Sequence, residues 1–397
     1  MGKEVHVDAT LVTNIGTLAT GEIGAPVLTD TSVLIEDGVI TAVGADAPGA
    51  GLVIDAAGQT VIPGLIDGHV HPTVGEWTPA QNSTGWVRNY LHGGTTSMVS
   101  AGELHIPGLP FEELTPRLVV GLARLARRTI GAYRPSGVKV HAGTLLLVPG
   151  LTEHDFDELA EDGIHQLKFI FYDWTRLDSG EPEQYLRWAH ERGMTVKMHS
   201  GGVSRSGSSR VAGHELVTAV APDVVAHISG GPIPMPDDEI VGVIDDLPDA
   251  TVEVCSSMNY RATKVTVDRL TEINALDRLT LGTDTPGGTG VIPRGMLRNL
   301  CYLSSVCGLA PEVAVAAGTG NVARRHAIPG GIIAPGQPGD LLVMGPVTGS
   351  RATNALEAIE LGDLPGISVV LVDGEPLVSG RSEQTPPPST GATVHHR

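Results

Sequence analysis

Between about residues 58 and 326 the chain alternates short apolar runs with longer helical stretches, and this repeat constrains the fold more than any other feature. Eight strand candidates lie at residues 61–71, 95–102, 137–147, 164–172, 194–200, 223–229, 250–257 and 278–284. Helical candidates, with apolar residues every three or four positions, include residues 111–130, 152–162, 181–193, 261–275 and 293–308. Eight strand-then-helix units predict an α/β fold, a (β/α)8 TIM-like barrel whose chemistry sits at the carboxyl ends of its strands.

The two ends of the chain have a different pattern. Both contain short β-rich runs separated by Gly, Asp and Pro, and neither end alone has enough strands to close a core. We therefore predict a small β-sandwich built from residues 1–57 together with 327–384, with the barrel between them at 58–326. The remaining residues, 385–397, are rich in Pro, Ser and Thr and are expected to be a flexible tail.

Composition narrows the class of partner and the location. A formal charge of −19 without a segregated basic patch argues against nucleic-acid binding. No window is long and apolar enough for a membrane span, and the first residues lack a secretory pattern, so we expect a cytoplasmic protein with no membrane contact. Cys255, Cys301 and Cys307 include no C-x-x-C pair and are expected to be reduced thiols.

Polar side chains recur where the predicted strands run out into loops. The first strand ends with His69 and His71, which face the same side because strand side chains alternate. A barrel would bring this pair together with four further groups, namely Lys168, His199, His227 and Asp284. Imidazole and carboxylate are ligands for borderline divalent ions such as Zn²⁺ or Fe²⁺. The pattern therefore predicts a metal site at the mouth of the barrel.

Each of these residues also fits a structural role when taken alone. The paired histidines fit surface polarity, His227 fits a buried core histidine, and Asp284 fits a turn cap. Lys168 fits a side chain whose ammonium reaches solvent. An apolar setting would instead lower its pKa, and a neutral amine can take up CO₂ to form a carbamate. Their coincidence at strand ends favours the metal site.

The chain resembles the amidohydrolase superfamily of metal-dependent hydrolases over essentially its whole length. The similarity is carried by H-x-H after PGLIDGH, a fourth-strand Lys, single His residues on strands five and six, and an eighth-strand Asp. It implies a binuclear centre, with His69, His71 and Asp284 on the first metal and His199 and His227 on the second. Carbamylated Lys168, formed with CO₂, would bridge the two ions. Zinc is expected, with iron or manganese as alternatives, in a homo-oligomeric dimer or tetramer.

These positions predict hydrolysis of a C–N amide bond in a small cyclic amide or enamide. A metal-bridging hydroxide would attack the carbonyl, with Asp284 as proton shuttle. Residues 91–102 and 223–232 are among the segments most similar to family members that open a cyclic enamide. Alternatives are hydrolysis of a lactam, hydantoin or cyclic imide, deamination, and ring closure by the reverse condensation. Lys168 favours hydrolysis over deamination, and a complete ligand set argues against a non-catalytic binding barrel.

Substrate contacts are expected from polar residues in or after other strands. The candidates are Glu103, His105, His141, Tyr172, Arg176, Asn259 and Tyr260. Each of them also fits a purely structural role. The glycine-rich residues 201–210 are expected to be a flexible loop over the site.

Overall fold

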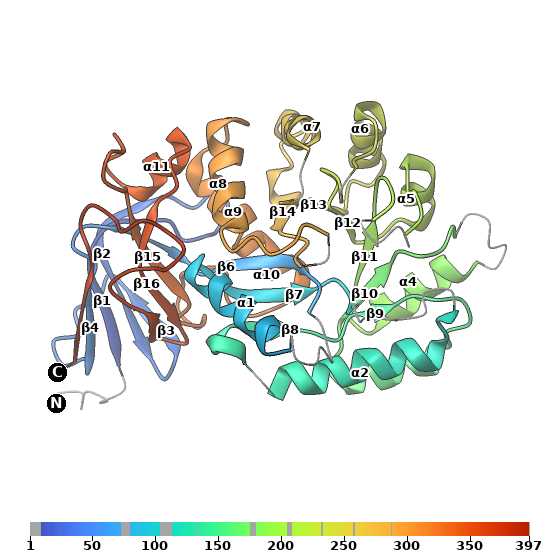
Figure 1. Cartoon of the computed structure of the whole chain (residues 1–397), viewed down its shortest axis with the longest axis horizontal. Helices are drawn as coiled ribbons and strands as arrows, with labels where there is room; N and C mark the ends of the chain where they lie inside the picture. The colour runs from blue at the N-terminus through green and yellow to red at the C-terminus, as the bar shows by residue number, and fades with distance from the viewer. Residues whose placement is uncertain are drawn as a thin grey trace.

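The computed structural model describes residues 9–72, 80–103, 113–132, 134–174, 180–204, 209–231, 233–256, 259–286 and 288–396. Within these ranges the fold is α/β and contains parallel sheets. Figure 1 shows a β-sheet formed by both chain ends on one side and the strand-and-helix region on the other. In the same ranges, no helix combines the length and apolar character that a membrane crossing requires.

All eight predicted strand segments of the central region contain β-structure. The strands are β6 (Leu65–Val70), β7 (Thr95–Ser100), β8 (Lys139–His141), β9 (Leu145–Leu146), β10 (Gln166–Phe169), β11 (Thr195–His199), β12 (Val224–Ala226), β13 (Thr251–Cys255) and β14 (Leu279–Gly282). They form two parallel sheets in the described residues, β6-β7-β8 and β9-β10-β11-β12-β13-β14. Parallel pairing in chain order places the strand ends, and the polar residues on them, at one edge.

The first and last of these strands also meet. Asp284 N donates to His69 O at 2.8 Å, and His71 N donates to Thr285 O at 2.6 Å. Buried Asp67 joins the same two strands, because one of its oxygens accepts from Thr283 N at 2.8 Å and the other from Thr283 Oγ1. Contacts between β6 and β14 therefore hold His69, His71 and Asp284 side by side.

The third predicted strand is divided in two. Its first part, β8, pairs with β7, whereas its second part, β9, pairs with β10. Between them Gly143 has φ +98°, and a Cβ at this position would lie 2.8 Å from Ala123 O on the helix α2 (Pro116–Ala132). Close packing of α2 thus bends the chain away from one continuous strand and leaves a break between the two parallel sheets.

Helices cover the parallel strands on both sides, with α5 to α8 on one side and α2 and α4 on the other (Figure 1). Their bounds are α1 (Ala80–His92), α2 (Pro116–Ala132), α3 (Glu153–Glu161), α4 (Glu181–Glu191), α5 (His214–Val220), α6 (Asp237–Asp246), α7 (Tyr260–Glu272), α8 (Gly295–Ser305), α9 (Pro311–Ala317), α10 (Gly320–His326) and α11 (Ala355–Leu361). The five predicted helical stretches are confirmed. In α2, for example, Val119, Ala123 and Ala126 recur at helical spacing and are buried.

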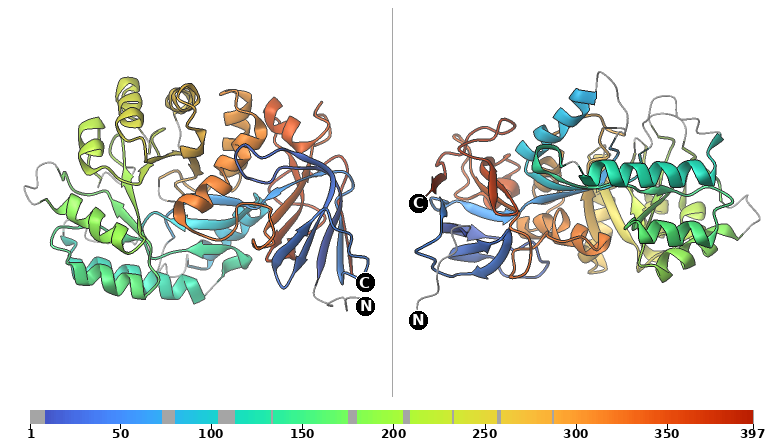
Figure 2. Two further views of the ribbon diagram at one scale, coloured as in Figure 1. Left: turned by 180° about the vertical axis from the view of Figure 1, so that it is seen from behind. Right: turned by 90° about the horizontal axis from the view of Figure 1, so that it is seen from below.

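The end sheet draws strands from both ends of the chain, as Figures 1 and 2 show. Its strands are β1 (Thr10–Leu18), β2 (Leu28–Glu36), β3 (Val39–Val43), β4 (Leu52–Asp55), β5 (Thr60–Pro63), β15 (Leu341–Gly345), β16 (Gly366–Val372), β17 (Glu375–Val378) and β18 (Thr393–His396). The predicted first strand, residues 61–71, is split at Gly64. Its first half, β5, pairs with β1 and β15, and its second half becomes β6. A Cβ at Gly64 would overlap the Thr96 side chain, so the chain can turn here only with glycine.

The last strand departs from the expected flexible tail. Residues Thr393–His396 form β18, which pairs antiparallel with β4. Buried Ala392 and partly buried Val394 pack against the core of the end sheet. The physical reason is that β4 would otherwise be a sheet edge with unpaired backbone groups, and the chain end covers it.

Candidate metal centre

Three predicted ligands meet where β6 and β14 end. His71 Nε2 lies 3.1 Å from Asp284 Oδ1, and His69 Nε2 lies 3.7 Å from the same oxygen. All three side chains are buried, and their ligand atoms lie within 4.8 Å of one another. His71 Nδ1 lies 2.7 Å from the carbonyl of Gly102 and can donate to it, which leaves the Nε2 lone pair for a cation. This arrangement fits one divalent ion.

Two further predicted ligands face each other across the next part of the site. His199 Nδ1 lies 3.2 Å from His227 Nε2, and the His227 ring centroid lies 5.2 Å from that of His69. Burial, reinforced by Lys168, lowers the pKa of His199 to about 4. Burial likewise lowers the pKa of His69 and His227 well below 6.5. These three imidazoles are therefore neutral near pH 7, which is the form that binds a metal.

Lys168 completes this group from β10. Its side chain is fully buried, and Nζ has no hydrogen-bond partner among the described residues. Burial, reinforced by Lys197, lowers its pKa to about 7, so much of the amine is neutral at physiological pH. We call the six residues His69, His71, Lys168, His199, His227 and Asp284 the metal-ligand cluster.

Two members of the cluster have an unusual backbone. His227 has φ +36° and Asp284 has φ +58°, and positive φ costs a non-glycine residue about 1–3 kcal/mol. A Cβ at Gly288 would overlap the Asp284 carboxylate, so this turn depends on glycine. Strained conformations of this kind persist where the surrounding structure fixes a side chain for function.

A buried ion pair behind His69 was not predicted. Glu253 Oε1 lies 2.5 Å from His69 Nδ1, and Glu253 Oε2 accepts from Lys197 Nζ at 2.6 Å. Lys197 also donates to the carbonyl of Gly68 at 2.6 Å. Burial alone would raise the pKa of Glu253, but Lys197 holds it below 4.5, so the residue is a carboxylate. This carboxylate keeps the proton of His69 on Nδ1 and turns Nε2 toward Asp284.

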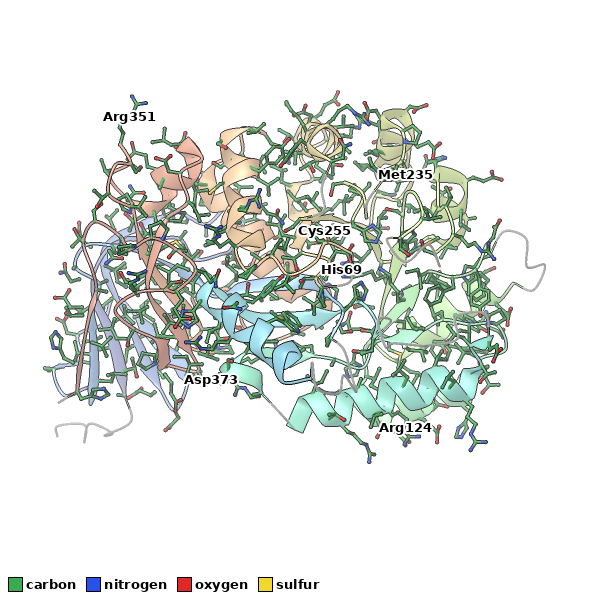
Figure 3. The ribbon with its side chains drawn as sticks, in the orientation of Figure 1. His69, Arg124, Met235, Cys255, Arg351 and Asp373 are labelled. Atoms are coloured by element: carbon green, nitrogen blue, oxygen red, sulfur yellow. The ribbon has the colours of Figure 1, made fainter. Side chains whose placement is uncertain are left out.

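The alternation of side chains along a strand, which identified the paired histidines, could also have found the buried ion pair. Glu253, Lys197 and Asp67 each lie two positions before another strand-end polar residue and so share its face. Cys255, two residues after Glu253, has its sulfur within 4.8 Å of ligand atoms on His69 and Glu253. Figure 3 shows the labelled His69 and Cys255 close together near the middle of the molecule.

Glu103 is a predicted substrate residue that interacts electrostatically with the metal-ligand cluster, through His71. Its Oε1 accepts from Ser100 Oγ at 2.8 Å and from Gly143 N at 3.0 Å, whereas its Oε2 has no partner among the described residues. Burial raises its pKa to about 7, although His71 opposes this rise. It is therefore a buried acid that can exchange a proton near neutral pH.

The other predicted substrate residues are dispersed. Tyr172 is half-buried against Trp174. Asn259 caps α7, since its Oδ1 accepts from Arg261 N and Ala262 N, and the neighbouring Tyr260 is 60% exposed. His141 lines a cavity at the break between the parallel sheets, and no member of the metal-ligand cluster lines that cavity. His105, Arg176 and part of the predicted loop 201–210 lie outside the described residues.

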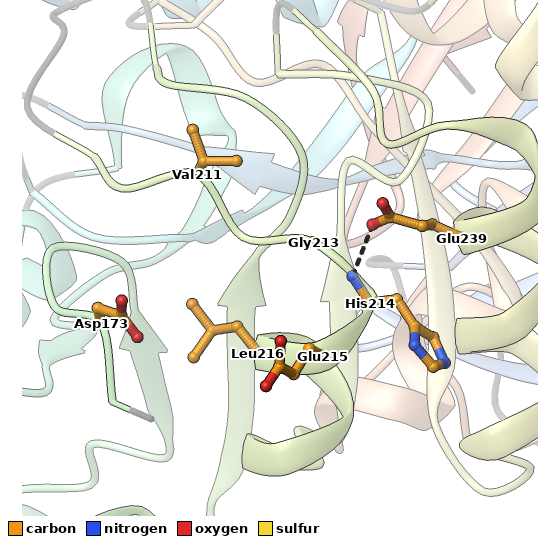
Figure 4. A pocket seen from close by; sticks show the side chains of 7 residues that line it. All are labelled: Asp173, Val211, Gly213, His214, Glu215, Leu216 and Glu239. Atoms are coloured by element: carbon orange, nitrogen blue, oxygen red, sulfur yellow. Dashed lines mark hydrogen bonds between the residues drawn. The ribbon is translucent and has the colours of Figure 1, made fainter. Parts of the chain in front are cut away.

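An open hollow of about 550 Å³ lies beside the segments that follow β10 and β11. Its lining includes Asp173, His214, Glu215 and Glu239, and His214 N donates to Glu239 Oε2 at 2.8 Å (Figure 4). No member of the metal-ligand cluster lines it. Its acidic character sets it apart from the cluster, where four imidazoles dominate.

Comparison with known proteins agrees with the geometry of the site. The amidohydrolase family profile matches residues 60–377. The chain belongs to the amidohydrolase family. Members of this family generally bind divalent metals, and this amidohydrolase has buried His, Asp and Glu groups able to do so.

Enamidase of Eubacterium barkeri is 39% identical to this amidohydrolase over 389 residues, which cover 97% of this chain and 99% of the relative. A solved enamidase structure superposes with a TM-score of 0.87 and covers 98% of this chain and all of the other. Imidazolonepropionase of Deinococcus deserti is 25% identical and covers 80% of this chain and 86% of its own. Molinate hydrolase, at 18% identity and a TM-score of 0.61 over 93% of this chain and 94% of its own, shares the fold.

Proposed function

We propose that this amidohydrolase hydrolyses the C–N bond of a small cyclic amide or enamide at a binuclear metal centre. The observation that carries the proposal is the approach of His69 and His71 to one oxygen of Asp284, at 3.7 and 3.1 Å. The 39% identity to enamidase over nearly the whole of both chains supports a cyclic substrate.

The donor atoms fit two divalent ions. Two atoms bound to one tetrahedral zinc at about 2.0–2.2 Å lie about 3.3 Å apart. The 3.1 Å between His71 Nε2 and Asp284 Oδ1 and the 3.2 Å between His199 and His227 match that spacing. His69, His71 and Asp284 would hold the first ion, and His199 and His227 the second. Zinc suits this nitrogen-rich set, with iron or manganese as alternatives.

Lys168 is proposed as the bridge, in its carbamylated form. A neutral lysine amine adds to CO₂ through its nitrogen lone pair and loses one proton, which gives a carbamate with two oxygens. The fully buried Nζ without a hydrogen-bond partner supports this proposal, because an unpaired ammonium is costly there. The shift of its pKa to about 7 supplies the neutral amine.

Bound divalent ions would lower the pKa of the attacking water and polarise the substrate carbonyl. The chain supplies the remaining steps. Asp284 accepts the proton that the attacking water loses and delivers it to the departing nitrogen as the C–N bond breaks. Water is thereby added across the amide, and a ring opens to a chain with a carboxylate and a free nitrogen. Glu253 and Lys197 are positioning residues, because Glu253 bonds His69 and Lys197 bonds Glu253.

A substrate panel tests the proposal. Metal-loaded protein would be incubated with cyclic enamides, lactams, hydantoins and cyclic imides, and ring opening followed by loss of the amide absorbance. We expect turnover of at least one class, none with His69→Ala, and full turnover with the exposed control His154→Ala. Ammonia release with the ring still closed would identify deamination instead, whereas ammonia released after ring opening is expected of an enamide, because its enamine product tautomerises and can lose ammonia. Ring closure from an amino acid product would identify the reverse direction. Absence of turnover in every class would overturn the proposal.

The framework of the site is also a proposal. We infer that the two parallel sheets form one (β/α)8 barrel, and that the end sheet belongs to a small β-sandwich. The predicted barrel of residues 58–326 would then begin near Gly64, because β5 pairs with strands of the end sheet. The contacts of β14 with β6 support closure of the barrel. A cytoplasmic location and a homo-oligomeric state stay predictions.

A further inference from the structure

The break between the two parallel sheets contains a cavity of about 400 Å³. It is lined by Arg127, His141, His165, Gln166 and His326, with glycines at positions 143, 163 and 193. We call it the seam cavity. It lies between β8, which pairs with β7 in one parallel sheet, and β9, which pairs with β10 in the other. None of its lining residues belongs to the metal-ligand cluster.

The seam cavity has a cationic lining in an acidic protein. Among the described residues no carboxylate side chain lines it. Arg127 is the charged group, and it makes no ion pair with a described residue. Its neighbours on α2, Arg124 and Arg128, both pair with Asp162, at 2.5 and 3.1 Å. A half-buried guanidinium without a partner in a chain of net charge −19 is available to a ligand.

Two imidazoles in the lining also have free nitrogens. His326 is 2% exposed, and its Nδ1 lies 2.7 Å from Gln166 Oε1, which can only accept. The proton therefore lies on Nδ1, and Nε2 is an acceptor without a partner in the described residues. Nε2 of His141 likewise has none. Burial lowers the pKa of His141 to about 4 and that of His326 well below 6.5, so neither of these two imidazoles carries a charge near pH 7.

A cation does not fit this lining. In the described residues, the His, Cys, Asp and Glu groups whose ligand atoms converge within 4.8 Å all lie around His69, not at the seam cavity. Arg127 would moreover repel a metal ion. Guanidinium binds carboxylate and phosphate oxygens through two parallel hydrogen bonds. The unpartnered acceptor on His326 calls for a donor on the same ligand.

We propose that the seam cavity is a second ligand site, which binds a small oxyanion that also carries a hydroxyl group. A carboxylate or phosphate oxygen pairs with Arg127, and the hydroxyl donates to His326 Nε2. This inference goes beyond the proposed hydrolysis, since it concerns different residues and is tested by binding alone.

Calorimetric titration of the metal-loaded full chain with glycolate, acetate and inorganic phosphate tests the site. Arg127→Met should weaken the binding of glycolate by about 10- to 100-fold, the range for a charged hydrogen bond. Arg128→Met is the matched control on the same helix and should bind as the wild type does. Acetate, which lacks the hydroxyl, should bind more weakly than glycolate. Tighter phosphate binding would assign a phosphate ligand in place of a carboxylate.

Anions that bind at the metal centre do not confuse the result, because they affect both arginine variants equally. Equal affinity of Arg127→Met and Arg128→Met for glycolate and phosphate would overturn the proposal. If Arg127→Met fails to fold, wild-type crystals soaked in glycolate or phosphate decide the question. Density beside Arg127 and His326 supports the site, and its absence at saturating ligand overturns it.

Discussion

The metal-ligand cluster and the seam cavity both contain imidazoles, those of the cluster all buried and that of His326 buried in the cavity, yet the two sites call for ligands of opposite charge. At the cluster, His69 and His71 lie beside the carboxylate of Asp284, and Glu253 stands behind His69. At the cavity the accompanying charged group is Arg127. A neutral imidazole accepts a metal as readily as a hydrogen-bond donor, so its neighbours decide which it binds.

The two regions also differ in how their charges are balanced. The cluster is backed by a closed pair, because Glu253 is bonded to both His69 and Lys197. Arg127 has no such counterion in the described residues. The protein itself therefore holds the imidazoles of the cluster in place, whereas the guanidinium in the cavity has no carboxylate partner in the described residues. The two are close enough for Lys197 and Glu253 to influence the charge state of His326.

The largest effect is expected from Asp284→Asn, which keeps the shape of the side chain and removes its basicity. Proton transfer by a positioned group contributes about 10²- to 10⁴-fold, so kcat should fall by that range. Metal content, measured by elemental analysis, should fall much less. Asp268→Asn, an exposed change on α7, serves as the control. An unchanged kcat in Asp284→Asn would remove its role as proton shuttle.

Variants of two buried lysines, Lys168 and Lys197, distinguish the bridging role from a general effect of a nearby positive charge. Partners of metal ligands alone are worth about 10- to 100-fold, so loss of the bridge in Lys168→Gln should lower kcat by roughly 100-fold or more. In wild-type protein supplied with ¹³C-bicarbonate, a carbamate signal should appear in the ¹³C spectrum. It should persist in Lys197→Gln and vanish in Lys168→Gln. A wild-type spectrum without that signal would exclude the carbamate.

Glu253→Gln tests whether the backing carboxylate prepares the cluster for a cation. The amide keeps the size of the side chain, but its charge is lost and Lys197 loses its counterion. Metal affinity, measured by competition with a chelator, should fall about 10- to 100-fold. Glu239→Gln, which changes a carboxylate in the outer hollow, should leave it unchanged. Equal metal affinities of Glu253→Gln and Glu239→Gln would show that the charge of Glu253 does not contribute to metal binding.

The strand-end ligands were predictable because two local rules were enough to find them. Alternation put His69 and His71 on one face, and the repeat of strands and helices put Lys168, His199 and Asp284 at strand ends. The resemblance to the family then gave them roles. All six predicted ligands lie close together in the structure, whereas their roles stay predictions.

What could not be predicted depends on contacts between distant elements. Glu253 and Lys197 matter because β13 and β11 bring them to His69 on β6, and no short segment contains that information. The division of the third strand follows from the packing of α2 on Gly143. Asn259 was expected to contact substrate, but its oxygen caps α7, a use that any strand-to-helix loop can make of Asn.

The smallest effect is expected at the cavity and comes from the pH dependence of stability. The folded-state pKa of His141, about 4, lies below its ordinary value of 6.5, because burial, Arg127 and Lys139 all disfavour its charge. The unfolded chain then binds the extra proton, so stability falls as pH drops from 6.5 toward 4. Between pH 7 and pH 5 this loss is about 2 kcal/mol. His141→Gln should lose correspondingly less stability on that interval, as followed by chemical denaturation, whereas exposed His154→Gln should behave as the wild type.

An ordinary titration of His141 near pH 6.5 would contradict this prediction, because it would put a second positive charge beside Arg127. The cavity would then differ from the cluster because its imidazole is protonated, and not because of the charged groups beside it.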